Sequence, residues 1–187
     1  MIVNDELRKL KIVLSIIVSV AIGSATSLHA FNRHITEDPT KTLHKFLSLD
    51  KKGARLETSS WQVIEPYTDW DEGVAWGHVV VISRFHIVED VTQWEIVSSV
   101  EAKIPVVFDV LGTMHWESVT FVPDPHQESH LFHIKAVYDR WQIVQSQLPP
   151  HVGRQRLMDF VRWTELGEPE ETRKALFASL HHQLKAQ

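Results

Sequence analysis

The stretch SVEAKIPVVFDV, residues 99–110, decides the fold class of this chain. Apolar side chains recur at every second position, and polar or mixed residues fill the positions between them. The apolar positions are Val100, Ala102, Ile104, Val106, Phe108 and Val110. Successive side chains of a strand point to opposite faces, so this period of two predicts a strand with one apolar face. Such strands are typical of an antiparallel sheet that is covered on one side.

Further segments with the strand period surround this stretch. They are HVVVISRFHIV (78–88), the longer run 94–114 that contains the quoted stretch, HWESVTFVPD (115–124), ESHLFHIKAVYD (128–139) and RWQIVQSQ (140–147). Short connections predict hairpins between neighbours. We place these connections at Gly112, at Pro123 with Pro125, and at Asp139 with Arg140. Pro105 inside the longest run predicts a bulge or an edge position, because proline has no N–H to donate.

Helical patterns lie on both sides of the strands. Asp38 and Pro39 predict the N-cap and first turn of a helix that ends near Gly53. A short helix is expected within residues 59–65, and two helices separated by Gly167 are expected after residue 153. The predicted fold class is therefore α+β, with N-terminal helices packed on a curved antiparallel sheet and C-terminal helices appended.

This order of elements resembles the NTF2-like superfamily, which includes the SnoaL-like and ketosteroid isomerase-like proteins. The most suggestive piece is Ala136-Val137-Tyr138, which turns through Asp139-Arg140 into Trp141-Gln142-Ile143. The resemblance covers residues 38–152 and leaves residues 153–187 as a C-terminal helical extension. It implies a cone-shaped sheet with a pocket at its open end. Members of the superfamily include isomerases, dehydratases, cyclases and non-catalytic binders, so the fold selects no chemistry.

Residues 1–30 read as a targeting segment. The basic residues Arg8, Lys9 and Lys11 precede the apolar run 12–22, and small residues follow at 23–27. This order predicts a signal peptide, cut after Ala25 or Ser27, and export to the periplasm or the medium. The alternative is an uncleaved membrane anchor formed by residues 12–30. In that case the N-terminal segment is the expected contact with a membrane.

Composition excludes several classes of function. The chain has 187 residues, a formal net charge of −5 and no cysteine. The lack of cysteine excludes disulfide scaffolds, thiolate metal sites and cysteine nucleophiles. The negative charge argues against a nucleic-acid partner. Motifs of α/β-hydrolases, P-loop NTPases and dinucleotide-binding proteins are also missing from the sequence.

The sequence predicts neither a metal site nor a cofactor. The densest histidine group is His126, His130 and His133. On a strand, His130 and His133 point to opposite faces and cannot share one coordination sphere. Asp109 and Glu101 alternate with the apolar residues, so the apolar face presents no obvious base for catalysis. The catalytic residues therefore stay unknown at this stage.

The candidate ligand-binding residues lie between the helices and the first long strand. They are Tyr67, Trp70, Trp76 and His78, in a segment that combines aromatic and acidic residues. Indole rings can cover an apolar ligand and still offer an N–H, so a small ligand of apolar or mixed polarity is expected there.

Three functions remain open on these grounds. The first is an exported, non-catalytic module that binds a small ligand or a protein. The second is a cofactor-free lyase or isomerase that acts in the cone pocket with a base from residues 67–78. The third is a homodimer formed through the mixed sheet face, where Val107, Leu131 and Val137 interrupt the polar residues.

Overall fold

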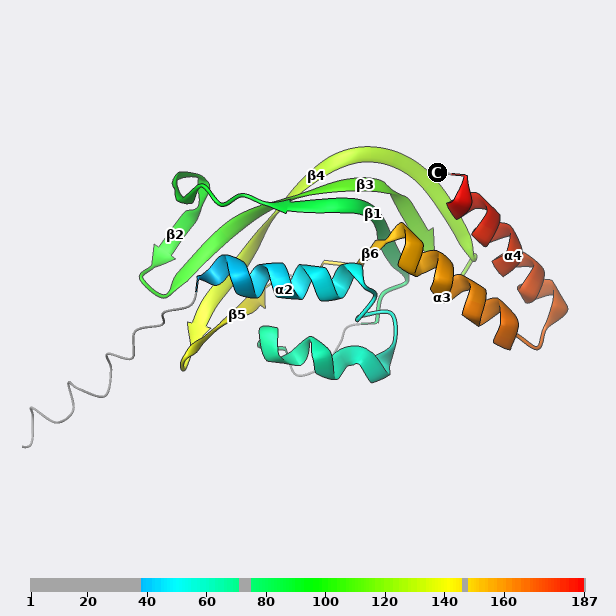
Figure 1. Cartoon of the computed structure of the whole chain (residues 1–187), viewed down its shortest axis with the longest axis horizontal. Coiled ribbons are helices and arrows are strands. Elements are labelled where there is room, and N and C mark those ends of the chain that lie inside the picture. The colour runs from blue at the N-terminus through cyan, green and yellow to red at the C-terminus, as the bar shows by residue number, and fades with distance from the viewer. Residues whose placement is uncertain (1–37, 71–74, 146–147, 187) are drawn as a thin grey trace, which may run out of the picture. The chain divides into compact units, whose positions relative to one another are not determined.

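Figure 1 shows the computed structural model, which describes residues 38–70, 75–145 and 148–186. Within these described ranges, six strands form one sheet in the order β5-β4-β3-β1-β6, and β2 pairs with β3 beside this path. The strands are β1 (His78–Ile87), β2 (Glu95–Ser98), β3 (Glu101–His115), β4 (Thr120–Val137), β5 (Arg140–Gln145) and β6 (His151–Gly153). The helices are α2 (Pro39–Lys51), α3 (Arg154–Gly167) and α4 (Glu171–Lys185), with short 3₁₀ helices η1 (Thr58–Val63), η2 (Glu65–Tyr67) and η3 (Val91–Gln93).

The predicted α+β class is confirmed, but the sheet is mixed. Strand β6 pairs in parallel with β1, and the other strand pairs are antiparallel. The expectation of a purely antiparallel sheet is wrong because the three-residue strand β6 runs beside β1 just before α3 begins. The helix after Pro39 is confirmed, and the Asp38 side chain accepts a hydrogen bond from the Thr40 backbone N–H at 2.9 Å.

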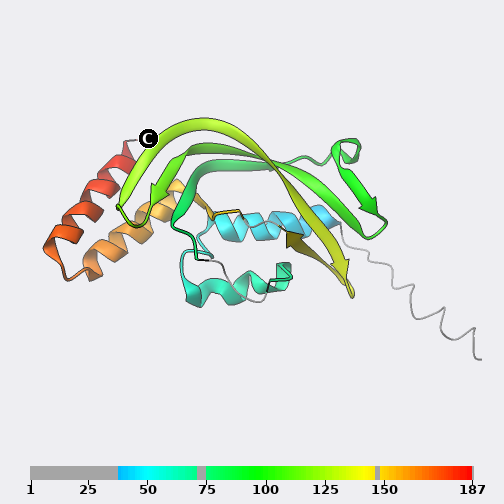
Figure 2. The ribbon, with the colours of Figure 1, turned by 180° about the vertical axis from the view of Figure 1, so that it is seen from behind.

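The sheet curls strongly, and β3 and β4 arch over α2 (Figures 1 and 2). The pairing of β3 with β1 and with β4 shifts register at the same level, next to Gly112. Such bulges bend a strand and increase its twist. Gly112 has φ +149°, and a Cβ atom there would lie 2.2 Å from the Val122 carbonyl oxygen. The close approach of β3 and β4 at this level therefore requires glycine.

The apolar side chains of β3 lie on one face, which we call the inner face because α2 packs against it. Ala102, Ile104, Val106, Phe108 and Val110 are all buried, as their spacing predicts. Phe46 of α2 contacts Phe132 of β4, with ring centroids 6.3 Å apart. Further along the sheet, α3 and α4 share an apolar cluster with β1, β3, β4 and β6. Its buried members include Val79, Val81, Met114, Phe121, Val152, Leu157, Val161, Phe177, Leu180 and Leu184.

Several strand boundaries differ from the prediction. The run 94–114 contains a hairpin, with β2 and β3 joined by a turn at residues 99–100, and Val100 is consequently exposed. The segments 115–124 and 128–139 belong largely to one strand, β4, so Pro123 and Pro125 lie within a strand. Gly112 likewise lies inside β3, and the turn from β3 to β4 occupies residues 116–119. Among the described residues, β5 pairs with β4 at residues 133–137 and not at the two prolines, which in this part of the structure lie on an edge of the sheet.

Pro105 sits at a gap between two neighbouring strands. Ile87, the last residue of β1, pairs with Val106, whereas Glu95 of β2 pairs with Lys103. The Pro105 carbonyl accepts a hydrogen bond from the Val88 N–H at 3.0 Å. The N–H and C=O of one residue in an antiparallel ladder face the same neighbour. The Pro105 nitrogen, which carries no N–H, therefore faces the gap between the paired parts of β1 and β2. For this reason the sheet tolerates proline at this point.

Residues 1–30, for which the sequence predicts an export signal or an anchor, lie outside the described residues. In the part of the chain that the structure describes, no helix is long and apolar enough to cross a membrane. The described residues from 38 to 186 form one compact unit, in which α3 and α4 share the core of the strands.

Candidate functional site

The predicted ligand-binding residues lie in two separate aromatic clusters. Trp70 stacks on Trp61 at a centroid distance of 6.3 Å and meets the edge of Phe46 at 6.0 Å. Tyr67, the last residue of η2, is half-buried nearby in sequence. Trp70 therefore contributes to the packing of α2 and η1.

The second cluster lies at the start of β1. Trp76 contacts the ring of His78, which in turn lies 5.9 Å from the ring of His115, its cross-strand partner on β3. Residues 71–74, between the two clusters, lie outside the described residues. Ligand binding by Tyr67, Trp70, Trp76 and His78 stays a prediction.

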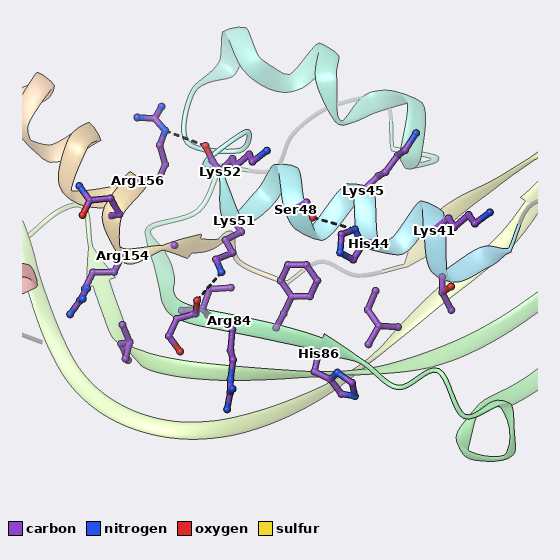
Figure 3. A pocket seen from close by; sticks show the side chains of 18 of the residues that line it. Lys41, His44, Lys45, Ser48, Lys51, Lys52, Arg84, His86, Arg154 and Arg156 are labelled. Carbon is purple, nitrogen blue, oxygen red and sulfur yellow. Dashed lines mark hydrogen bonds between the residues drawn. The ribbon is translucent and has the colours of Figure 1, made fainter.

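A large crevice lies elsewhere, between α2, β1 and the start of α3 (Figure 3). Its volume is about 1340 Å³. Among the described residues that line it, seven are Lys or Arg and one, Glu89, is acidic. The basic residues are Lys41, Lys45, Lys51, Lys52, Arg84, Arg154 and Arg156. Arg84 pairs with Asp109 and Arg156 pairs with Glu57, two acids outside the lining. The lining is still predominantly basic, in a chain whose net charge is negative.

The basic side chains occupy different parts of this crevice. Lys51 points from α2 toward β1, and its ammonium group donates to the Ser83 carbonyl at 2.7 Å (Figure 3). Lys41 and Lys45 extend from α2 away from β1, and Arg84 extends on the far side of β1. Arg156 donates to the Lys52 carbonyl at 3.1 Å. Lys51 thus supplies the ammonium group between helix and strand.

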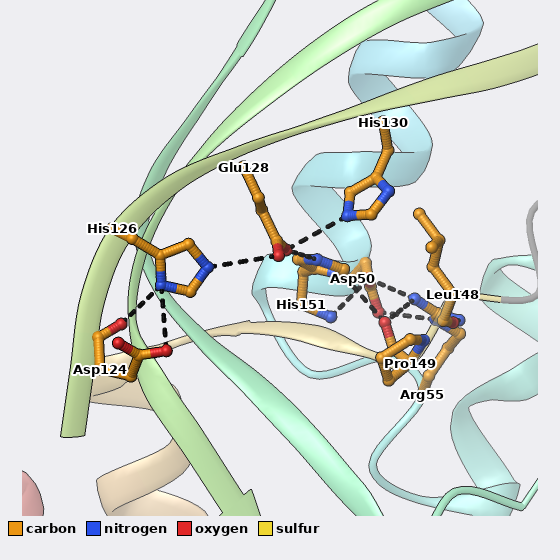
Figure 4. A network of polar contacts seen from close by, with 9 residues as sticks. All are labelled: Asp50, Arg55, Asp124, His126, Glu128, His130, Leu148, Pro149 and His151. Atoms are coloured by element: carbon orange, nitrogen blue, oxygen red, sulfur yellow. Dashed lines mark hydrogen bonds and ion pairs between the residues drawn. The ribbon is translucent and has the colours of Figure 1, made fainter. Parts of the chain in front are cut away.

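A polar network lies inside the curled sheet, beside the apolar core (Figure 4). Asp50 of α2 accepts two hydrogen bonds from Arg55, at 2.8 Å from Nε and 2.6 Å from Nη2. Arg55 also donates to the carbonyls of Leu148 and Pro149, at 2.8 and 3.2 Å. Both side chains are buried, with 1% of Asp50 and 8% of Arg55 exposed. Because the charges are paired and their hydrogen-bonding groups are engaged, the interior can hold them.

His151 joins this pair to the sheet. Its backbone N–H donates to Asp50 Oδ2 at 2.9 Å, and its Nδ1 lies 2.8 Å from the Pro149 carbonyl oxygen. Its ring packs against Phe108, with centroids 4.2 Å apart. Nε2 lies 3.0 Å from Glu128 Oε1. Only 3% of the His151 side chain is exposed, so the ring is held on every side.

These contacts restrict the protons on His151. The Pro149 carbonyl can only accept, so Nδ1 must carry a proton. Nε2 then faces the Glu128 carboxylate, which is also an acceptor, and the contact needs either a second proton or a cation. The hydrogen bond to His151 lowers the pKa of Glu128 to about 2, although desolvation acts in the opposite direction. Glu128 is therefore ionised at neutral pH and is a weak general base.

The prediction that the inner face presents no obvious base is wrong, because titratable side chains of β4 lie on it. In the β3–β4 register, Val106, Phe108 and Val110 lie opposite His130, Glu128 and His126 respectively. Directly opposite residues share a face, so these three polar side chains continue the inner face. The signal was present in the sequence, because positions 126, 128 and 130 have the same parity as Phe132 and Ile134. Glu128 and His130 lie inside the predicted strand segment 128–139, but only Asp109 and Glu101 were considered as strand acids. His126 lies outside that segment, in the loop expected at the two prolines.

His130 and His133 point to opposite faces of β4, as predicted, whereas His126 shares the inner face with His130. His133 lies on the outer face, where its Nε2 is 2.5 Å from Glu101 Oε1. His130 Nε2 lies 3.4 Å from Glu128 Oε1 on the inner face. His126 Nε2 lies 3.6 Å from the other oxygen of Glu128, and a hydrogen bond to the Asp124 carbonyl raises the pKa of His126.

The strand acids Asp109 and Glu101 lie on the outer face. Asp109 is bound by Arg84 and Gln127, and the hydrogen bond from Arg84 lowers its pKa. Neither acid reaches the interior network. Instead, each acid forms an ion pair with a residue on a neighbouring strand.

Comparison with family models, curated proteins and solved structures finds no match to this chain. The resemblance to the NTF2-like superfamily stays a prediction, and functional conclusions must come from the two sites themselves.

Proposed function

We propose that this domain is a non-catalytic module that binds a small, multiply charged anion in the crevice between α2 and β1. The observation that supports this is the lining of the crevice, where the described residues include seven basic side chains and one acidic side chain. The whole chain has 19 basic and 24 acidic residues, so the basic residues are concentrated at this place. A cleft lined by one sign of charge raises the local concentration of oppositely charged ligands.

The start of α3 adds a second favourable feature. Gly153 is the N-cap of α3 and, having no side chain, offers no capping group to the first backbone N–H groups. These N–H groups carry partial positive charge and are common binding points for phosphate and carboxylate groups. Gly153, Arg154 and Arg156 line the same crevice as Lys51. One end of the crevice therefore combines a helix N-terminus with basic side chains.

Size favours a ligand with several charged groups. Small-molecule pockets usually have about 300–1,000 Å³, and this crevice is larger. A single inorganic ion would leave most of it filled with water. The proposal keeps the binding role expected from the sequence, but it moves the site away from residues 67–78 and makes the ligand anionic.

Calorimetric titration with inorganic phosphate, pyrophosphate and tripolyphosphate tests the proposal. The protein is first freed of metal by dialysis against a chelator, so that a metal-bridged anion cannot account for binding. Affinity should rise with the charge of the anion and fall with ionic strength. Lys51→Met removes the ammonium group but keeps an apolar stem, and should weaken binding about tenfold, as the loss of one charge-assisted hydrogen bond does.

Lys135→Met is the matched control, because Lys135 is an exposed lysine of β4 outside the crevice. It should leave the affinity unchanged. If both variants weakened anion binding equally, the change in net charge alone would explain the effect. A specific binding site in the crevice would then be contradicted. Failure of all three anions to bind at low salt would also refute the proposal.

A further inference from the structure

We propose that Glu128, His130 and His151 form a site for one first-row divalent cation, with Zn²⁺ the best fit, inside the curled sheet. The ligand atoms are Glu128 Oε1, His130 Nε2 and His151 Nε2. One atom from each of these residues lies within 4.8 Å of the others. This site is independent of the anion-binding proposal, because none of its three residues lines the crevice.

The fold brings the three ligands together from distant strands. Glu128 and His130 are two positions apart on β4, so both side chains point to the inner face. His151 belongs to β6, which is separated from β4 in the sheet by β3 and β1. The curl of the sheet places His151 opposite β4 across the interior, where Figure 4 shows its ring next to Glu128. The site therefore exists only in the folded chain.

The distances suit tetrahedral coordination. Zinc binds imidazole nitrogen and carboxylate oxygen at about 2.0–2.1 Å, so two ligand atoms of a tetrahedral site lie roughly 3.3 Å apart. Glu128 Oε1 lies 3.0 Å from His151 Nε2 and 3.4 Å from His130 Nε2. The third separation, between the two histidines, closes by rotation of His130, whose side chain is one-third exposed.

His151 is already oriented as a metal ligand. Metal-binding histidines usually donate the second ring N–H to a carbonyl or carboxylate, which fixes the tautomer and the ring direction. Here Nδ1 donates to the Pro149 carbonyl at 2.8 Å, so the lone pair of the neutral ring is on Nε2, facing Glu128 and His130. Arg55 also donates to this carbonyl, and Asp50 holds the His151 backbone. The supporting contacts of a ligand are thus in place.

The donor set selects the class of metal. Two imidazoles and one carboxylate suit Zn²⁺ and its first-row neighbours, whereas Mg²⁺ and Ca²⁺ prefer oxygen ligands throughout. Three protein ligands leave a fourth position for solvent. Glu128 and His130 are partly exposed while His151 is buried, so the metal would enter from the side of β4. This departs from the sequence prediction of no metal, which weighed His133 instead of His151 as the partner of His130.

The first experiment titrates the chelator-treated full chain with Co²⁺, followed by its visible absorption, and with Zn²⁺ in competition. One equivalent of Co²⁺ should give the intense bands of a four-coordinate ion, and Zn²⁺ should displace it while Mg²⁺ does not. Zn²⁺ should also raise the melting temperature, because it binds only the folded chain. Absence of a stoichiometric Co²⁺ or Zn²⁺ complex would overturn the proposal and identify the cluster as an imidazolium–carboxylate ion pair.

Variants locate the ion. Glu128→Gln and His130→Ala should each weaken Zn²⁺ binding at least about tenfold, and neither side chain is fully buried, so both variants are expected to fold. His133→Ala is the matched control, since it removes an imidazole from the outer face of the same strand. The cross-strand pair His78 and His115 is a competing surface site, which His115→Ala removes. Binding lost in His115→Ala but kept in Glu128→Gln and His130→Ala would refute the assignment.

Discussion

Strand β4 presents two different surfaces along a single face. Toward its C-terminal end the inner face carries Phe132 and Ile134, which are 2% and 0% exposed. Toward its middle the same face carries Glu128 and His130, whose side chains are 27% and 33% exposed. The difference follows from what lies opposite: Phe46 of α2 packs on Phe132, whereas His151 faces Glu128. Alternation along a strand thus identifies a face, and the facing element determines its chemistry.

The largest expected effect comes from breaking the bend that brings these surfaces around the interior. Gly112→Ala places a Cβ 2.2 Å from the Val122 carbonyl oxygen and 2.8 Å from the Phe121 ring, at a φ of +149° that L residues rarely adopt. The Val122 carbonyl belongs to the backbone of β4, so backbone must move to relieve that contact, and the free energy of unfolding should fall by about 4 kcal/mol or more. Urea denaturation measures this loss.

Gly77→Ala is the control for the bend. A Cβ atom at Gly77 meets nothing within 4 Å, and its φ is not positive, so its effect should be under about 0.5 kcal/mol. A tolerated Gly112→Ala would mean that β3 and β4 can separate at this level without cost. The curl would then have another cause, such as the packing of α2.

The next effect sharpens the contrast between the two parts of β4. Ile134→Ala removes a fully buried side chain from the apolar part and should cost about 2–5 kcal/mol. Lys135→Ala, on the opposite face, should cost under about 0.5 kcal/mol. His130→Ala in the metal-free protein should cost at most about 1 kcal/mol, because its side chain is one-third exposed. Denaturation of all three at one pH compares them directly, and a loss for His130 as large as for Ile134 would abolish the distinction drawn here.

Local patterns predicted the helices and the faces of the strands because their causes lie within a few residues. The Asp38 cap, the break at Gly167 and the buried series from Ala102 to Val110 depend on short-range chemistry. Strand β6 gave no such pattern, because three residues are too few to show a period and their partners in β1 lie about seventy positions earlier. Pairing of that kind depends on the curl of the whole sheet.

Both candidate sites escaped prediction for the same physical reason. The interior cluster needs His151 from β6 next to Glu128 from β4, although these strands are not neighbours in the sheet. The basic crevice combines α2, β1 and the start of α3. Four of its seven basic residues lie within residues 41–52, but their proximity to Arg84, Arg154 and Arg156 depends on the fold. The aromatic residues at 67–78 gave a predicted site because they are close in sequence. Of these, Trp70 packs against Phe46, so part of that signal was core packing.

The smallest expected effect is an increase in the free energy of unfolding, from a substitution at the turn where the apolar part of β4 ends. Val137 pairs with Arg140, so Tyr138 and Asp139 form a two-residue hairpin loop, and Tyr138 has φ +60°. When only the first of the two loop residues has a positive φ, glycine is favoured at that first position. The Tyr138 side chain is 95% exposed, so its ring contributes little packing. Tyr138→Gly should therefore stabilise the protein by about 0.5–1 kcal/mol in urea denaturation. Asp139→Gly, at the position whose φ is not positive, should give no gain, because glycine there only adds freedom to the unfolded chain. Equal effects of the two variants would show that the tyrosine backbone is not strained and that the turn contributes nothing specific to the end of β4.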